Sequence, residues 1–154
     1  MSVSLYWEPQ WRADQKEPLA REALAQRGIE EFVVQHSCLK VIELERRPSE
    51  SGIPTNSALV LQAKRTSPRP DRVVLVVLRE LGPRLLIGLP VLIEGGTEVV
   101  IEVRVLDPAT SRVLADTRTQ WRNGGAFVIK GTKSLDMDLN AALSAVLMPA
   151  SAAP

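Results

Sequence analysis

The side chains of this chain that could support chemistry are few, and the two most reactive lie close together. His36 is the only histidine and Cys38 the only cysteine. They could form a nucleophile–base pair or half of a metal site, but zinc takes three or four ligands and the sequence has no second Cys/His cluster. We therefore expect no metal and no catalytic residue, and interpret both side chains as structural, because free cysteine usually behaves as a small buried hydrophobe.

A glycine-rich segment near the C-terminus, GGAFVIKGTKS at 124–134, superficially has the composition of a phosphate-binding loop. Five residues instead of four separate Gly125 from Gly131, and Thr132 separates Gly131 from Lys133. The interior Phe-Val-Ile favours a strand, whereas a phosphate needs bare backbone N–H groups around it. We expect no nucleotide and no other cofactor.

A pair of carboxylates, Asp136 and Asp138, could in principle do acid–base work. Two residues apart on a helix, they point in different directions and do not converge on one substrate. The better interpretation is that they lie in the first turn of a helix, where the helix dipole favours negative charge, with Ser134 as the N-cap.

Three of the six aromatic residues, Tyr6, Trp7 and Trp11, lie within the first eleven positions. Tryptophan and tyrosine are enriched at protein interfaces, so these three residues are the candidate interaction surface. The alternative is a first strand packed into the core, with Trp7 buried and Trp11 covering an edge. Both interpretations stay open, although a small domain needs large side chains in its core.

The overall composition indicates an ordinary globular protein. The chain has 154 residues with 19 Lys+Arg against 18 Asp+Glu. This balance argues against a nucleic-acid partner, which normally requires a clustered basic excess. The length predicts a single domain over residues 1–148, followed by a disordered tail at 149–154.

The first half of the chain alternates strands and helices. Apolar alternation predicts a strand at 3–7, and Pro18 at a first turn begins a helix that ends at Gly28 or continues to about His36. A β-branched strand follows at 39–44. Thr55 or Asn56 could then N-cap a short second helix.

The second half predicts consecutive strands and one closing helix. Residues 73–78 are all apolar and predict a buried strand. Turns are expected at Gly82-Pro83, Gly95-Gly96 and Asp107-Pro108, and a tight turn or bulge at 123–125. They separate strands at 85–93, 99–105 and 113–122 and a short one at 126–130. Pro90 places the strand at 85–93 at an edge or bulge. The fold class is therefore α+β: a two-layer sandwich with a mixed sheet, a C-terminal β-meander and helices packed mainly on one face.

The hairpin formed by the predicted strands at 99–105 and 113–122, together with the closing helix, shows a family resemblance. ELGPRLLIGLPVLIEGGTEVVIEVRVLDPATSRVLADTRTQW followed by SLDMDLNAALSAVL resembles small bacterial envelope lipoproteins of the ABC-transport-auxiliary, curli-assembly and TolB N-terminal-like type. The resemblance covers about residues 19–147. It implies a non-enzymatic accessory component of a cell-envelope transport or assembly system that acts by protein–protein contact, and it assigns no functional residue.

The compartment and the partner follow from that resemblance as expectations. The N-terminal MSVSLYWEPQW has neither a basic region nor an apolar run typical of an export signal. The expected location is the periplasm or the envelope membrane, with membrane contact only through a native lipid anchor absent from this chain; the alternative is the cytoplasm.

Two other functional classes stay open. One is a cytoplasmic small-molecule-binding or enzymatic domain with a cleft near Trp7 and Trp11. The other is a homo-oligomeric structural subunit that pairs through an apolar edge at 85–93.

Overall fold

The computed structural model describes residues 1–48, 52–88, 92–126, 128 and 130–148. The chain divides into two compact units. The first unit comprises Met1–Gln10, Val33–Leu78 and Glu102–Arg118, and the second comprises Trp11–Phe32, Arg79–Ile101 and Thr119–Pro154. The prediction of a single domain over 1–148 stays a prediction, and the tail at 149–154 lies outside the described residues.

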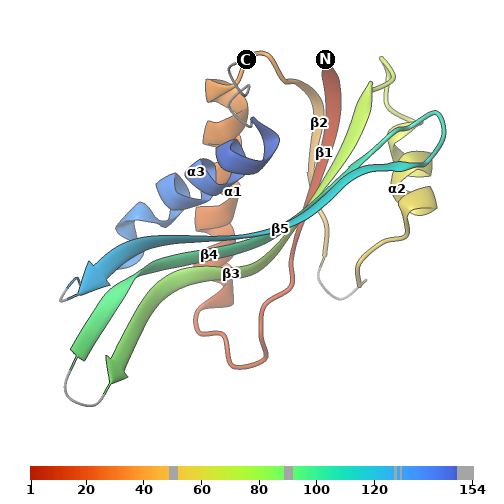
Figure 1. Ribbon diagram of the computed structural model, residues 1–154. Helices are drawn as coiled ribbons and strands as arrows, with labels where there is room; N and C mark the ends of the chain where they lie inside the picture. The colour runs from red at the N-terminus through yellow and green to blue at the C-terminus, as the bar shows by residue number, and fades with distance from the viewer. Residues whose placement is uncertain (49–51, 89–91, 127, 129, 149–154) are drawn as a thin grey trace. The chain divides into compact units, whose positions relative to one another are not determined.

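Five strands form one mixed sheet in the order β2-β1-β3-β4-β5 (Figure 1). β1 pairs in parallel with both of its neighbours, so Tyr6 lies opposite Glu45 on one side and Leu75 on the other. The strand at either end of this order, β2 or β5, has a neighbour on one side only. The strands are β1 (Ser2–Pro9), β2 (Lys40–Arg46), β3 (Arg72–Gly88), β4 (Leu92–Leu106) and β5 (Val113–Ala126).

The first unit contains the short helix α2 (Asn56–Ala63). Its N-cap is Thr55, whose hydroxyl accepts a hydrogen bond from the Ala58 N–H and so satisfies one of the free donors of the first turn. The buried face of α2 joins apolar side chains of the strands in a single core cluster: Tyr6, Leu59, Val60, Ala63, Val73, Leu75, Val77 and Leu106.

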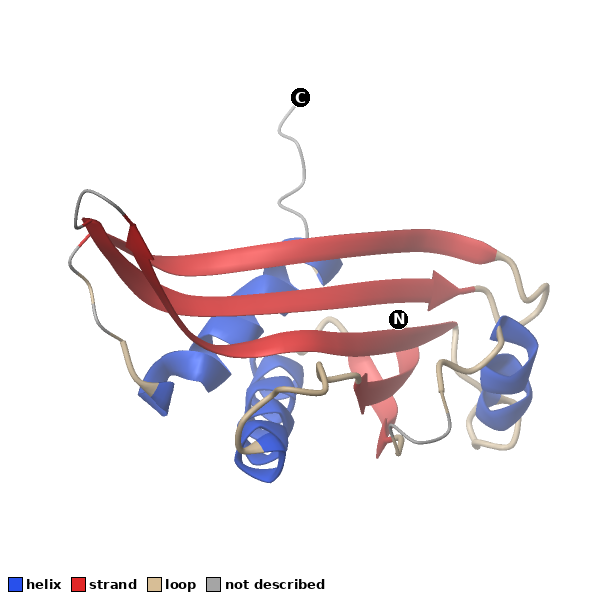
Figure 2. Cartoon of the chain, turned by 90° about the horizontal axis from the view of Figure 1, so that it is seen from below, coloured by secondary structure: helices blue, strands red, loops and turns tan. Residues whose placement is uncertain are grey.

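The second unit contains most of α1 (Pro18–Gln35), the single 3₁₀ turn η2 (Thr132–Ser134) and α3 (Leu135–Leu147). Figures 1 and 2 show α1 and α3 side by side. They approach closely at Gly28, where the backbone of α3 leaves no room for a side chain. The buried face of α3 includes Leu135, Leu139, Ala142 and Leu143, which are inaccessible to solvent. The α+β fold with a mixed sheet and helices packed against it is therefore confirmed.

Two predicted turns are wrong, because the strands run through them, and at 123–125, where a tight turn or a bulge is expected, no turn interrupts the strand. β3 continues past Gly82-Pro83, β4 contains Gly95-Gly96, and β5 contains 123–125. Gly96 is needed because the neighbouring strand β5 lies very close: a Cβ at this position would be 2.7 Å from the Gly124 Cα. Gly96 therefore permits close backbone contact between β4 and β5, and the glycines of these strands do not mark chain reversals.

The separate strand expected at 85–93 is also wrong, whereas pairing through an apolar edge there stays a prediction. Residues 85–88 end β3 and residues 92–93 begin β4, while Pro90 falls in 89–91, outside the described residues. The expected short strand at 126–130 falls partly outside them as well; Ala126 ends β5, and neither Val128 nor Lys130 is in a strand.

The turn at Asp107-Pro108 is confirmed, and it includes one residue in a left-handed conformation. Ser111 has φ 59°, and its N–H donates to the Asp107 carbonyl at 2.8 Å. A residue other than glycine is strained in the left-handed conformation, because its Cβ lies too close to the following carbonyl oxygen. We expect Ser111→Gly to raise the free energy of unfolding by about 0.5 kcal/mol, since the relief of strain exceeds the extra freedom glycine gives the unfolded chain. Urea denaturation measures this change. Ser111→Val should destabilise, and a Val variant as stable as the wild type would contradict the argument.

Candidate functional site

The three aromatic residues of the candidate interaction surface are divided between the units. Tyr6 and Trp7 belong to the first unit, and their side chains are fully buried. The guanidinium of Arg46 lies 5.9 Å from the centre of the Trp7 ring. Trp11 belongs to the second unit and is partly exposed. In this structure only Trp11 is accessible to a partner, and the role of these aromatics in an interface stays a prediction.

Tyr6 belongs to a small polar cluster under α2. Its hydroxyl donates to the Glu43 carboxylate at 2.5 Å, and the Thr66 hydroxyl donates to the same oxygen at 2.8 Å. Burial, together with the hydrogen bond to Glu43, raises the pKa of Tyr6 well above its usual range. Partial burial opposes ionisation of Glu43, but the hydrogen bonds from Tyr6 and Thr66 outweigh it, so the pKa of Glu43 lies below its usual value.

The lowered pKa of Glu43 predicts a contribution to acid sensitivity. A carboxyl whose pKa is lower in the folded state stabilises the protein above its unfolded-state pKa, and this stability is lost as the pH falls through the folded-state value. We expect wild-type stability to fall as the pH drops below about 4.5, and Glu43→Gln to lose less over that range. Urea unfolding between about pH 7 and pH 3 tests this. Thr66→Val should reduce the pH dependence in part; equal slopes for wild type and Glu43→Gln would contradict the assignment.

His36 and Cys38 lie in the short loop between α1 and β2, where the Leu39 N–H donates to the His36 carbonyl at 2.9 Å. Cys38 is exposed and forms no disulfide, so it does not behave as the small buried hydrophobe that free cysteine usually is. Within the described part of the chain no group of three or more His, Cys, Asp or Glu side chains could hold a metal ion.

The two carboxylates of α3 have different environments. Asp138 is the centre of a hydrogen-bonded group that the sequence does not predict; we call Asp138 and its three partners, Thr97, Asn123 and Ser134, the polar node. Asp138 is 3% exposed. It accepts hydrogen bonds from the Thr97 hydroxyl, the Asn123 amide (2.7 Å) and the Ser134 hydroxyl (3.2 Å). Ser134 occupies the N-cap position but makes no side-chain cap. Asp136 instead lies 3.7 Å from Arg27 of α1. The node therefore links α3 to β4 and β5.

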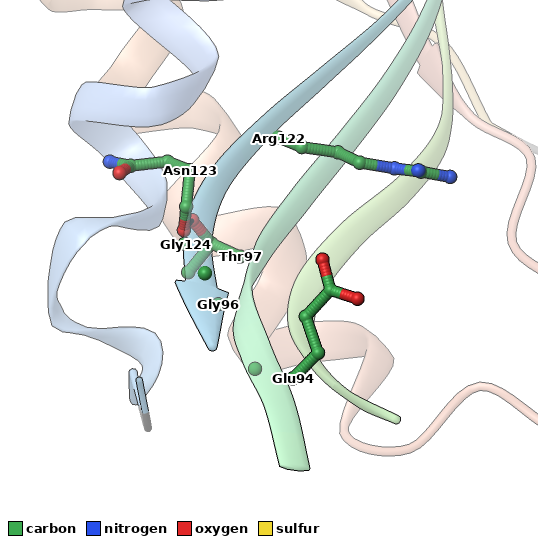
Figure 3. Close-up of a pocket in the computed structure, with 8 residues that line it drawn as sticks. Glu94, Gly96, Thr97, Arg122, Asn123 and Gly124 are labelled. Atoms are coloured by element: carbon green, nitrogen blue, oxygen red, sulfur yellow. Dashed lines mark hydrogen bonds between the residues drawn. The ribbon is translucent and has the colours of Figure 1, made fainter. Parts of the chain in front are cut away.

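The surface beside this node has a small hollow of about 90 Å³, well below the roughly 300 Å³ at which ligand pockets begin. Figure 3 shows Asn123 pointing towards α3, whereas Arg122 points to the other side of β5. The amine of Lys130 donates to the Asn123 carbonyl oxygen at 2.5 Å. The Asn123 side chain thus accepts a hydrogen bond from Lys130 and donates one to Asp138. Because these three polar side chains are hydrogen-bonded to one another, we interpret them as structural.

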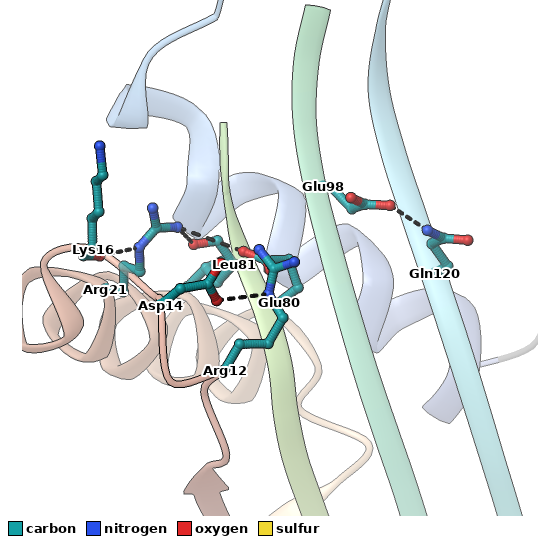
Figure 4. A network of polar contacts seen from close by, with 8 residues as sticks. All are labelled: Arg12, Asp14, Lys16, Arg21, Glu80, Leu81, Glu98 and Gln120. Atoms are coloured by element: carbon teal, nitrogen blue, oxygen red, sulfur yellow. Dashed lines mark hydrogen bonds and ion pairs between the residues drawn. The ribbon is translucent and has the colours of Figure 1, made fainter. Parts of the chain in front are cut away.

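A second, wider groove of about 560 Å³ lies on the second unit. Its charges are paired: Arg12 lies 3.2 Å from Glu80, and Arg122 lies 3.1 Å from Glu98. Figure 4 shows the guanidinium groups of Arg12 and Arg21 converging on Glu80. Since the two cationic and two anionic side chains of the lining balance, the groove has no net charge with which to attract an ionic ligand.

The most exposed regular element of the first unit is the beginning of β5. Every residue from 113 to 118 is exposed, and β5 is an edge of the sheet. Val113 and Leu114 expose 44% and 48% of their surface, which is high for apolar residues in a strand. Asp116 pairs with Arg104 at 3.1 Å, and Arg118 pairs with Glu102 at 3.5 Å, so both charged side chains lie on the same face as their β4 partners. We call the segment Val113–Arg118 the β5 edge.

Comparisons with known proteins give structural likenesses only. No protein-family model matches the chain, and no curated protein matches it. Among solved structures it is similar to the PelC dodecamer from Paraburkholderia phytofirmans, with 14% identity over 98% of this chain and 89% of that one and a TM-score of 0.48. Lipoprotein GNA1162 from Neisseria meningitidis matches with 12% identity over 96% and 98% of the two chains and a TM-score of 0.45.

A third similar structure is protein XCC0632 from Xanthomonas campestris, of the family DUF330, with 13% identity over 95% of this chain and 79% of that one and a TM-score of 0.44. The neighbours are thus bacterial proteins that include a lipoprotein. At these identities and TM-scores, the likeness assigns neither a family nor a function to this chain. Among the described residues, no helix is both long and apolar enough to cross a membrane.

Proposed function

We propose that this chain is a non-enzymatic component of a bacterial cell-envelope transport or assembly system and acts by protein–protein contact through the β5 edge. The observation that carries the proposal is the exposure of every residue from 113 to 118 on a strand at the end of the sheet order. An edge strand presents unpaired backbone N–H and C=O groups, which are a template for another strand. Main-chain hydrogen bonds then supply affinity and alternate side chains supply selectivity.

The chemistry of the β5 edge supports a protein partner. Exposed Val113 and Leu114 provide apolar surface, while Asp116 and Arg118 provide one charge of each sign. Interfaces combine apolar contact with oriented polar pairs in this way. The envelope location rests on the resemblance of the hairpin and closing helix to envelope lipoproteins.

Site-specific photo-crosslinking in the native cell tests both parts of the proposal. A photoreactive amino acid at Leu114 should give a protein adduct that fractionates with the envelope. The matched control is Leu61, a leucine on α2 of the same unit that is also exposed, at 59% against 48% for Leu114. Adducts at Leu61 but none at Leu114 would refute the β5 edge as the contact surface. Adducts found only in the cytosol would refute the envelope location.

A further inference from the structure

We propose that the partner of the β5 edge is a second copy of this chain, whose own β5 edge pairs antiparallel with it about a two-fold axis at Thr117. This inference rests on the proposed contact function and names the partner. It follows from the order of charges on the edge. In an antiparallel pair centred on Thr117, Asp116 of one copy lies opposite Arg118 of the other, and Arg118 of the first lies opposite Asp116 of the second.

The contacts within one chain extend this complementarity. On each copy Asp116 is already paired with Arg104, and Arg118 with Glu102. Pairing the two edges therefore produces two ladders of alternating sign across four strands. One runs through Glu102, Arg118, the second copy's Asp116 and its Arg104, and the other is its symmetry mate. Opposite charges directly across neighbouring strands stabilise a sheet, and like charges destabilise it.

The exposure of these side chains leaves them available for a second contact. The Asp116 side chain is 53% exposed and that of Arg118 is 69% exposed, although both have an intrachain partner. Thr117 is exposed between them and would meet its own copy in a Thr–Thr cross-strand pair. Because the pairing uses the same surface on both copies, it closes as a dimer and does not propagate into a fibre.

Complementary charge reversal tests the register directly. Asp116→Arg places two arginines opposite one another at both symmetry-related positions, and Arg118→Asp places two aspartates there. Each variant alone should raise the dimer dissociation constant about tenfold to a hundredfold. An equal mixture of the two should restore the dimer, since every arginine of one variant then faces an aspartate of the other. Sedimentation equilibrium over a concentration series distinguishes the 16.9 kDa chain from a species of twice that mass.

The matched control is Asp14→Arg. Asp14 is also an exposed aspartate in an ion pair, 3.7 Å from Arg12, and its substitution changes the net charge by the same amount and sign as Asp116→Arg. It should leave dimerisation unchanged, and thermal melts should show that all three variants fold. A wild-type chain that remains monomeric would overturn the proposal, as would reversal variants that still dimerise or a mixture that does not recover.

A disulfide test does not depend on the charge variants folding. In a Cys38→Ser background, Thr117→Cys should form an intermolecular disulfide under oxidation, because the two-fold axis places this residue opposite itself within bonding reach. Ala115→Cys should not, since its two copies are offset by four residues, roughly 13 Å along the strand. Equal cross-linking at both positions would overturn the register. A monomer in both tests, with a Leu114 adduct to another protein in the cell, would refute only self-pairing; no Leu114 adduct would refute the contact function.

Discussion

Replacing Asp138 with alanine is expected to lower the free energy of unfolding by about 2–4 kcal/mol, a large share of the stability of a small protein. The side chain is 3% exposed and accepts hydrogen bonds from Thr97, Asn123 and Ser134. Without the carboxylate, the buried Thr97 hydroxyl keeps only a long hydrogen bond of 3.4 Å to the Asn123 backbone carbonyl, and the part-buried Asn123 amide loses its acceptor. Leaving a buried donor unsatisfied costs its full desolvation penalty, about 1–3 kcal/mol for each group. Urea denaturation of purified wild type and variant at neutral pH measures the difference.

Two variants separate this loss from general damage to α3. Asp138→Asn keeps the shape and one acceptor oxygen, so its loss should be about half that of the alanine variant. Asp136→Ala removes a carboxylate from the same helical turn, where the partner is a half-exposed Arg27 at 3.7 Å, and should cost about 1 kcal/mol or less. Equal losses at 136 and 138 would show that both act through the helix dipole and would contradict the role of the node.

The expectations from the sequence succeed where local chemistry alone decides the structure. The Thr55 cap, the Asp107-Pro108 turn and the strand at 73–78 each depend on residues that are adjacent in the chain. Glycine does not indicate its role locally, because the same residue type permits either a chain reversal or the close approach of another strand. Gly96 is required by Gly124, which is remote in the sequence.

The candidate site shows the same limit. The sequence places Asp138 in the first helical turn and does not indicate its hydrogen-bond partner Thr97, because Thr97 lies forty-one residues away and no spacing rule connects the two. The edge position of β5 depends on the order of strands in the sheet, which hydrophobic alternation does not give. The sequence leaves the placement of Tyr6 and Trp7 open between surface and core. The burial of Tyr6 depends on the apolar cluster that it forms with the buried face of α2, a contact between segments remote in the chain.

Gly28→Ala is expected to destabilise the protein by about 1–3 kcal/mol, although the same change inside an ordinary helix would stabilise it. In a helix interior alanine is favoured over glycine by about 1 kcal/mol. At Gly28 a Cβ would lie 2.7 Å from the Asp136 carbonyl oxygen and 3.2 Å from the Asp136 Cα. Both atoms are backbone, so no rotamer change relieves the contact, and α1 and α3 must separate. The sign of the change therefore reports whether the two helices touch at this point.

Gly131→Ala is the matched control for this prediction, because an added Cβ there meets no atom within 4 Å and the residue precedes η2 in an extended conformation. Its effect should remain within about 0.5 kcal/mol of the wild type. If Gly28→Ala is instead stabilising, the helix propensity of alanine outweighs the contact, and α1 and α3 do not approach as closely as this structure shows. If Gly28→Ala and Asp138→Ala are both strongly destabilising while Gly131→Ala and Asp136→Ala are not, the first turn of α3 is fixed by two independent contacts. One is the backbone of α1, and the other is the polar node on β4 and β5.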